Sequence, residues 1–275
     1  MHKYLLSTEE IKCYYEISKI CQQKNNGKIQ EHTDKVIHAL YENLIQTVES
    51  INLLVKEKKY ITAKSLFRKC IEIGSNLNCI MEHPKSANII RDRAMLLNAF
   101  TLQQYMHRIK LLYDKVSDSE SKDSIESSIN ELSPLIGYNF SSVDEALEHF
   151  TIERDNRYKN KKGKKNLWFT GCTDLESKHE FIDKYGEIAK SNTSFLYNLQ
   201  SEDIHGTGVL LSLNTESFNS FSRQEWIILL AINKLLEKPT DNLLTYNKAR
   251  KKCEVQIQYL VKKYDEKQKY MNALK

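Results

Sequence analysis

Glycine and proline are scarce in this chain, and their scarcity constrains its fold more than any other feature. The 275 residues include 8 glycines and 3 prolines, whereas average usage would give roughly 19 and 14. Both residues interrupt helices, and strand-rich folds use glycine in their turns. We therefore expect an all-α protein, built as a bundle of long antiparallel helices.

Apolar residues recur at steps of three or four along most of the chain, which is the period of an amphipathic helix. Alternation with a period of two is weak, so no strand is predicted. We expect Pro239 to separate the last two helices, because proline interrupts helical hydrogen bonding. The predicted helices cover residues 33–56, 60–82, 86–116, 119–132, 142–153, 174–182, 184–205, 222–237 and 243–271.

Several helix starts are marked by a serine or threonine followed three residues later by glutamate. In this capping-box pattern the hydroxyl accepts from a backbone N–H of the first turn, and the carboxylate reaches back to the cap. The pattern occurs at Ser7 with Glu10, Ser117 with Glu120, Ser142 with Glu145, Thr173 with Glu176, and Ser222 with Glu225.

The length allows one large domain, and we expect a single helical domain over 1–275 with the helices of 222–271 packed on the rest. No run of 18 apolar residues and no apolar N-terminal signal core is found, so we expect a cytoplasmic protein without membrane contact. The six cysteines form no C-x-x-C pair, and no H-E-x-x-H pattern occurs. We therefore predict no metal and no cofactor.

The positive charge of the chain is concentrated in one segment. The net charge is +5, while residues 154–165 alone hold seven Lys and Arg and one Asp. We expect a basic surface loop here, in which cations contact phosphates and an aromatic ring stacks on a base. A plain solvated loop would have the same composition. The candidate nucleic-acid contacts are Arg154, Arg157, Lys159, Lys161, Lys162, Lys164, Lys165 and Trp168.

Two polar helix faces carry the residues that we expect to form a site. Arg68 and Glu72 stand four apart on one predicted helix, opposite its apolar arc, so their side chains can touch. Tyr197, Ser201 and His205 recur every four residues on a later predicted helix. If the two faces oppose each other across a cleft, a cation, a carboxylate, hydroxyls and an imidazole meet in one place.

Such a cleft would suit phosphate chemistry. The forked guanidinium of Arg68 would hold a phosphate, and His205 would act as an acid or base near neutral pH. Glu72, Tyr197 and Ser201 would organise them. A simpler interpretation also fits, because Arg68 and Glu72 can form a solvated ion pair and His205 can end its helix before a capping glycine.

Three motifs in this order resemble a bacterial family catalogued as domain of unknown function 5677. They are the Ser-Leu-x-Arg-x-x-x-Glu helix at 65–72, Trp168, and Tyr-x-x-x-Ser-x-x-x-His-Gly at 197–206. The resemblance covers roughly residues 35–210. It implies a helical bundle, and no established activity comes with it.

A weaker similarity is to the HEPN helical bundles (higher eukaryotes and prokaryotes nucleotide-binding), many of which are RNases of bacterial defence and toxin systems. Their signature is Arg, then four to six residues, then His on one helix, and no Arg stands at that distance before any of the eight histidines here. An Arg–His pair would therefore have to combine Arg68 and His205 from different helices.

Taken together, these features favour a bacterial defence- or toxin-type protein that binds RNA, or cleaves it without a metal ion. Two alternatives stay open. One is a non-enzymatic helical module that docks a partner protein or a second copy of the chain. The other is a sensor of small nucleotides that uses the same pocket.

Overall fold

The computed structural model describes residues 5–24, 32–130, 140–158, 167–186 and 223–272. The secondary structure of these residues is helical and includes no strand, which confirms the predicted all-α class. The chain divides into two compact units, residues 1–90 with 177–275 and residues 91–176. One boundary falls inside the helix Ala87–Tyr113, and the other falls just before the helix Lys178–Tyr185. Neither boundary lies in the basic segment 154–165. The single domain over 1–275 stays a prediction.

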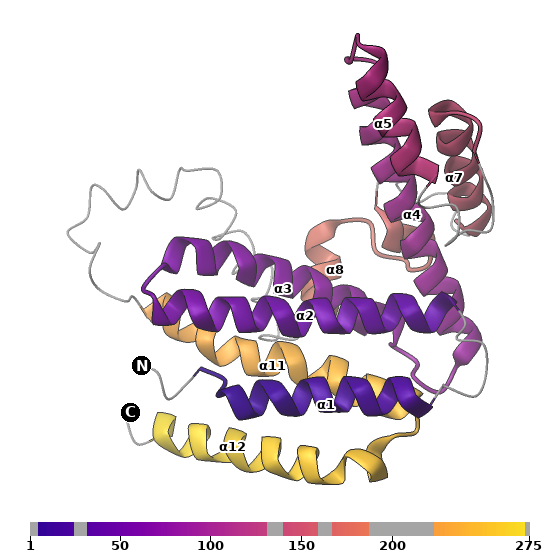
Figure 1. The fold of residues 1–275 in the computed structure, drawn as a ribbon. Helices are drawn as coiled ribbons and strands as arrows, with labels where there is room; N and C mark the ends of the chain where they lie inside the picture. The colour runs from indigo at the N-terminus through magenta and orange to yellow at the C-terminus, as the bar shows by residue number, and fades with distance from the viewer. Residues whose placement is uncertain (1–4, 25–31, 131–139, 159–166, 187–222, 273–275) are drawn as a thin grey trace. The chain divides into compact units, whose positions relative to one another are not determined.

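Unit 1 is built on a long antiparallel helix pair, α2 and α3 (Figure 1). In α2, Ile37, Leu44, Val48, Ile51 and Val55 are buried, so the predicted helical spacing does form the core face. Helices α8 and α11 pack on α3, α1 packs on α2, and α12 packs on α1. The bounds of this unit's helices are α1 Thr8–Lys24, α2 His32–Lys56, α3 Tyr60–Ile80, α8 Lys178–Tyr185, α11 Arg223–Tyr246, the 3-10 helix η4 Arg250–Cys253, and α12 Glu254–Asn272.

Helices α2 and α11 end in the same way, with a lysine in the left-handed backbone conformation. Lys58 has φ 57° and Lys248 has φ 49°. After each, the next residue donates back over five residues, Lys59 N to Leu54 O at 2.8 Å and Ala249 N to Leu244 O at 2.9 Å. These are Schellman motifs, which satisfy the last carbonyls of a helix and usually place glycine at the left-handed position.

The prediction that Pro239 separates two helices is wrong, because Pro239 lies inside α11. Proline removes one backbone donor and disfavours a helix interior. Here Leu235, Leu236, Leu243 and Leu244 on both sides of it are buried, so packing holds the helix together across the proline. The break comes later, at the Schellman motif.

Two of the predicted capping residues do cap a helix. At Ser7 both bonds of the box form, since Glu10 N donates to Ser7 Oγ at 3.1 Å and Ser7 N donates to Glu10 Oε2 at 2.8 Å. Ser142 caps α7 as predicted, although the carboxylate of Glu145 accepts from Ser141 instead.

The predicted caps at Ser117 and Thr173 are wrong. Asp118, one residue later, accepts from the Ser121 N–H at 2.7 Å. Helix α8 starts at Lys178, with a complete capping box between Ser177 and Glu180. Ser222 lies outside the described residues.

Unit 2 holds the rest of α4 (Ala87–Tyr113), α5 (Ser119–Asn130), α7 (Val143–Arg157) and the 3-10 helix η2 (Trp168–Gly171). One apolar cluster joins the three α-helices and consists of Met106, Ile129, Phe140, Val143, Ala146 and Phe150. None of the described helices in either unit is both long enough and apolar enough to cross a membrane.

Candidate functional site

Arg68 and Glu72 lie on α3 and touch, as their spacing predicts. Arg68 Nε and Glu72 Oε1 are 3.8 Å apart, and the side chains are 24% and 36% exposed. The face opposite them carries Cys70 and Leu77, which are fully buried. The pair is therefore held at the surface of unit 1 by the packing of α3 and stays within reach of solvent.

A third charged group, Lys178, joins this pair from another helix. Its Nζ lies 3.7 Å from the same Glu72 oxygen, Oε1. The capping box of Ser177 and Glu180 fixes the start of α8 and makes Lys178 its first residue. Because α8 packs on α3, this first turn is brought beside Glu72. We call Arg68, Glu72 and Lys178 the α3–α8 charge cluster.

The charge cluster holds two cations and one carboxylate. The distances from Glu72 to Arg68 and to Lys178 both exceed those of ordinary hydrogen bonds. The carboxylate therefore attracts the two cations by charge and forms no short two-bonded pair with either at these distances. Burial lowers the pKa of the Lys178 ammonium, Glu72 opposes this shift, and Arg68 adds to it. An anion that approached Arg68 and Lys178 would relieve the repulsion between them and favour the charged lysine.

Sequence reasoning missed Lys178, although a signal for it was present. The serine and glutamate of the capping box stand three apart at Ser177 and Glu180, and they place Lys178 in a first helical turn. That pattern gives the start of α8. The position of α8 on α3 is a tertiary contact that no local pattern predicts.

The other half of the predicted site, Tyr197, Ser201 and His205, lies outside the described residues. Whether these side chains meet Arg68 and Glu72 therefore stays a prediction.

The predicted basic loop starts too early. Arg154 and Arg157 belong to the last turn of α7. Arg154 donates twice to Asp155 Oδ1, at 3.0 and 2.8 Å, and Arg157 donates twice to Glu153 Oε1, at 3.2 and 3.0 Å. Their charges are thus balanced within their own helix. Lys159, Lys161, Lys162, Lys164 and Lys165 lie outside the described residues.

Trp168 was predicted to stack on a base, and the structure corrects this. It begins the 3-10 helix η2, and only 6% of its surface is exposed. Its ring meets that of Phe169 edge to face, at 6.4 Å between centroids. A large aromatic side chain gains most by burial, and a buried ring offers no face to a nucleobase. Trp168 is a core residue of unit 2.

No group of three or more His, Cys, Asp and Glu side chains is placed to hold a metal ion in the part of the chain that the structure describes. For the whole chain, the absence of a metal and of a cofactor stays a prediction. The groups that the cluster offers to a ligand are a guanidinium and an ammonium, which suit an anion.

The model of one protein family, the family of unknown function (DUF5677), matches residues 34–225 of this chain. The match includes all three charged groups described above and the predicted positions Tyr197, Ser201 and His205. Among curated proteins no match is found. Among solved structures no match is found either.

Proposed function

The chain belongs to the family of unknown function DUF5677, and we propose that it binds RNA and cleaves it without a metal ion at the α3–α8 charge cluster. Lys178 carries this proposal. A half-buried ammonium with a lowered pKa, beside a second cation and the carboxylate of Glu72, favours an anionic ligand. The phosphate of an RNA backbone is such an anion.

In the proposed reaction Arg68 and Lys178 contact the two non-bridging oxygens of one phosphate. The ribose 2′-hydroxyl attacks the phosphorus, and His205 takes up its proton. The bond from phosphorus to the 5′-oxygen breaks, and that oxygen takes a proton from water as it leaves. Both cations stabilise the charge that grows on the phosphate oxygens, while Glu72, Tyr197 and Ser201 position the charged groups.

Binding and cleavage are tested separately, with a labelled single-stranded RNA in EDTA. Lys178→Gln should weaken RNA binding roughly tenfold or more, since a hydrogen bond to a charged group contributes about 1.5–3 kcal/mol. The slope of log affinity against log salt should also fall by about 0.7, the value for one phosphate contact on a single strand.

Lys184→Gln is the matched control. Lys184 lies on the same helix and pairs with Glu82 at 3.2 Å, away from the cluster. It should leave binding unchanged. Equal loss in both variants would overturn the proposed site, because it would reveal only a diffuse effect of charge.

His205→Ala separates chemistry from binding. We expect it to keep the affinity for RNA and to lose cleavage. If the unaltered protein binds RNA but releases no product in EDTA, the cleavage part of the proposal fails and a binding protein remains. If it binds no RNA, the whole proposal fails.

A protein-docking role is the second candidate, and a different observation favours it. Tyr105, Leu111 and Leu112 of α4 are 44%, 49% and 51% exposed, which is high for large apolar side chains. A sensor of small nucleotides would use the charge cluster itself. In that case a mononucleotide would bind with an affinity that Lys178→Gln weakens, and RNA would not compete with it.

A further inference from the structure

The inner side of α12 is fixed to α1 by polar contacts that lie far apart in the sequence. Lys267 Nζ donates to Glu10 Oε1 at 2.6 Å, and these side chains are 10% and 4% exposed. Gln256 Nε2 donates to Glu16 Oε2 at 3.1 Å. The rotation of α12 about its own axis is therefore set, and its opposite side is turned outward.

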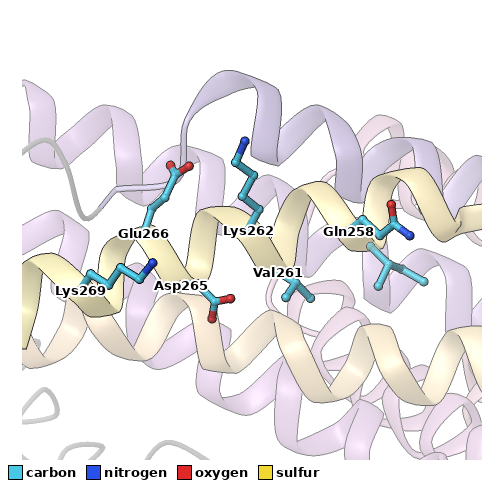
Figure 2. Close-up of a pocket in the computed structure, with 7 residues that line it drawn as sticks. Gln258, Val261, Lys262, Asp265, Glu266 and Lys269 are labelled. Carbon is cyan, nitrogen blue, oxygen red and sulfur yellow. The ribbon is translucent and has the colours of Figure 1, made fainter.

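The outward side presents two valines between charged residues. Val255 is 76% exposed and Val261 is 55% exposed. Among the other large hydrophobic side chains described in unit 1, only Leu53 is as exposed as Val261. Gln258 lies midway between them and donates to Glu254 Oε1 at 3.3 Å. Figure 2 shows Gln258, Val261, Lys262 and Asp265 along α12, with the side chain of Lys262 on one side of the helix and those of Val261 and Asp265 on the other. These four are among the residues that line a groove here.

Seven exposed residues form what we call the α12 outer stripe. They are Lys251 of the preceding 3-10 helix η4, and Glu254, Val255, Gln258, Val261, Lys262 and Asp265 of α12. Counted from Gln258 they stand three, four and seven positions away in both directions. Those are the spacings that share one helix face. The stripe is therefore continuous along the helix and symmetric in position about Gln258.

The stripe is also complementary to itself. When two helices pack antiparallel about a two-fold axis, residues equally distant from the axis in opposite directions face each other. With the axis at Gln258, Val255 meets Val261 of the other copy. Glu254 meets Lys262, and Lys251 meets Asp265. At the axis Gln258 faces Gln258 of the other copy. Each of the other three facing pairs is either apolar or of opposite charge, and the symmetry makes each of these three occur twice.

We propose that the α12 outer stripe binds a second copy of this chain, in an antiparallel two-fold dimer centred on Gln258. Charge complementarity selects this occupant, because no facing pair places like charges together. Within α12, from Glu254 to Asp265, the contact extends about 16 Å at 1.5 Å per residue, and Lys251 of η4 lengthens it. One helix pair buries less than a standard interface, so the dimer is weak and reversible.

Charge reversal tests the pairing. The oligomeric state is measured by sedimentation velocity over the micromolar range for the full chain. Glu254→Lys and Lys262→Glu each place like charges opposite one another twice, so each should weaken the dimer at least tenfold. The double variant Glu254→Lys/Lys262→Glu restores opposite charges and should restore dimerisation. All these side chains are exposed, so the fold is kept, and circular dichroism verifies this.

Mixing the two single variants is the most specific test. In a mixed dimer the Glu254→Lys chain faces the Lys262→Glu chain, and both contacts between positions 254 and 262 then join a lysine to a glutamate. The mixture should therefore dimerise where each variant alone does not. Lys252→Glu is the control, since Lys252 is exposed but lies outside the stripe, and it should leave dimerisation unchanged.

The proposal is overturned by a chain that stays monomeric over the whole concentration range. A dimer that persists in both single variants overturns it as well, because the contact would then use another surface. The RNA-binding test changes residues of the α3–α8 charge cluster, whereas the dimer test changes residues of α12. A negative result in one test therefore leaves the other proposal unaffected.

Discussion

Tyr41 and Thr240 share a buried hydrogen bond of 2.7 Å between their side-chain oxygens, although 199 residues separate them in the chain. Thr240 Oγ1 donates its single proton to the carbonyl of Leu236. The Tyr41 hydroxyl must therefore be the donor to Thr240. This bond ties α2 to α11 close to Pro239, where the helix lacks a backbone donor.

A double-mutant cycle tests this relationship. Tyr41→Phe removes the donor and should lower the free energy of unfolding by about 1 kcal/mol. Thr240→Val should cost more, about 1–3 kcal/mol, because it leaves the tyrosine hydroxyl buried without an acceptor. The double variant should lose less than the sum of the two. Strict additivity in urea denaturation would show that the two oxygens are not coupled.

The ion pair of Lys267 and Glu10 predicts a large effect on stability. Lys267→Met should destabilise the protein by about 3–5 kcal/mol, since it leaves a carboxylate buried without its partner. Adding Glu10→Gln removes that charge and should recover most of the loss. Lys263→Met is the control, because Lys263 pairs with Glu266 where the two side chains are 34% and 45% exposed, and the urea midpoint of this variant should stay near that of the wild type.

Lys58 predicts a gain in stability. A left-handed backbone costs a non-glycine residue about 1–2 kcal/mol, and glycine avoids this cost. Glycine also makes the unfolded chain more flexible, and this offsets part of the gain. Lys58→Gly should therefore raise the free energy of unfolding by about 0.5 kcal/mol. Lys56→Gly, two residues earlier within α2, should lower it by about 1 kcal/mol. Thermal unfolding of both variants gives the comparison, and the same sign for both would contradict the Schellman assignment.

Gly171 predicts a steric effect within unit 2. A Cβ atom at this position would lie 2.6 Å from Tyr158 Cδ2 and 3.0 Å from Leu96 Cδ2. Gly171→Ala should therefore cost about 1–3 kcal/mol, because it forces the buried Tyr158 ring to move. Gly74→Ala is the matched control. Its nearest neighbour is Leu235 Cδ2 at 3.6 Å, an ordinary contact, and alanine favours the interior of α3. We expect Gly74→Ala to stabilise the protein.

His38 predicts how stability changes with pH. It is 4% exposed, and neither ring nitrogen has a hydrogen-bond partner within the described residues. Burial lowers the pKa of His38, while Asp34 and Glu42 oppose that shift. The unfolded chain thus takes up a proton near pH 6.5 that the folded protein takes up only at lower pH. Stability is lost as the pH falls below about 6.5, by up to 1.4 kcal/mol per pH unit.

This loss should disappear in His38→Leu. Urea midpoints between pH 7.5 and pH 5 would be compared for the wild type, for His38→Leu and for the exposed control His107→Gln. We expect a flatter profile in His38→Leu alone. Equal slopes in all three proteins would show that other groups cause the acid sensitivity.

The charge cluster shows how far local patterns reach. Arg68 and Glu72 could be paired from the sequence because four residues along a helix fix their separation. Lys178 could not, because its distance from Glu72 depends on how α8 packs on α3. The capping box at Ser7 could be predicted for the same reason as the pair of Arg68 and Glu72, because its residues stand close together along one helix. Thr173 carries the same sequence pattern and caps no helix.

By itself the sequence determined the helical class, the buried face of α2 and the ion pair on α3, because each depends on residues within one or two turns of one another. The tertiary structure alone decided that α11 continues through Pro239, that Trp168 is buried and that Lys178 completes the charge cluster. In these cases packing between distant segments outweighs local preference, since burial of apolar surface contributes more than a single propensity does.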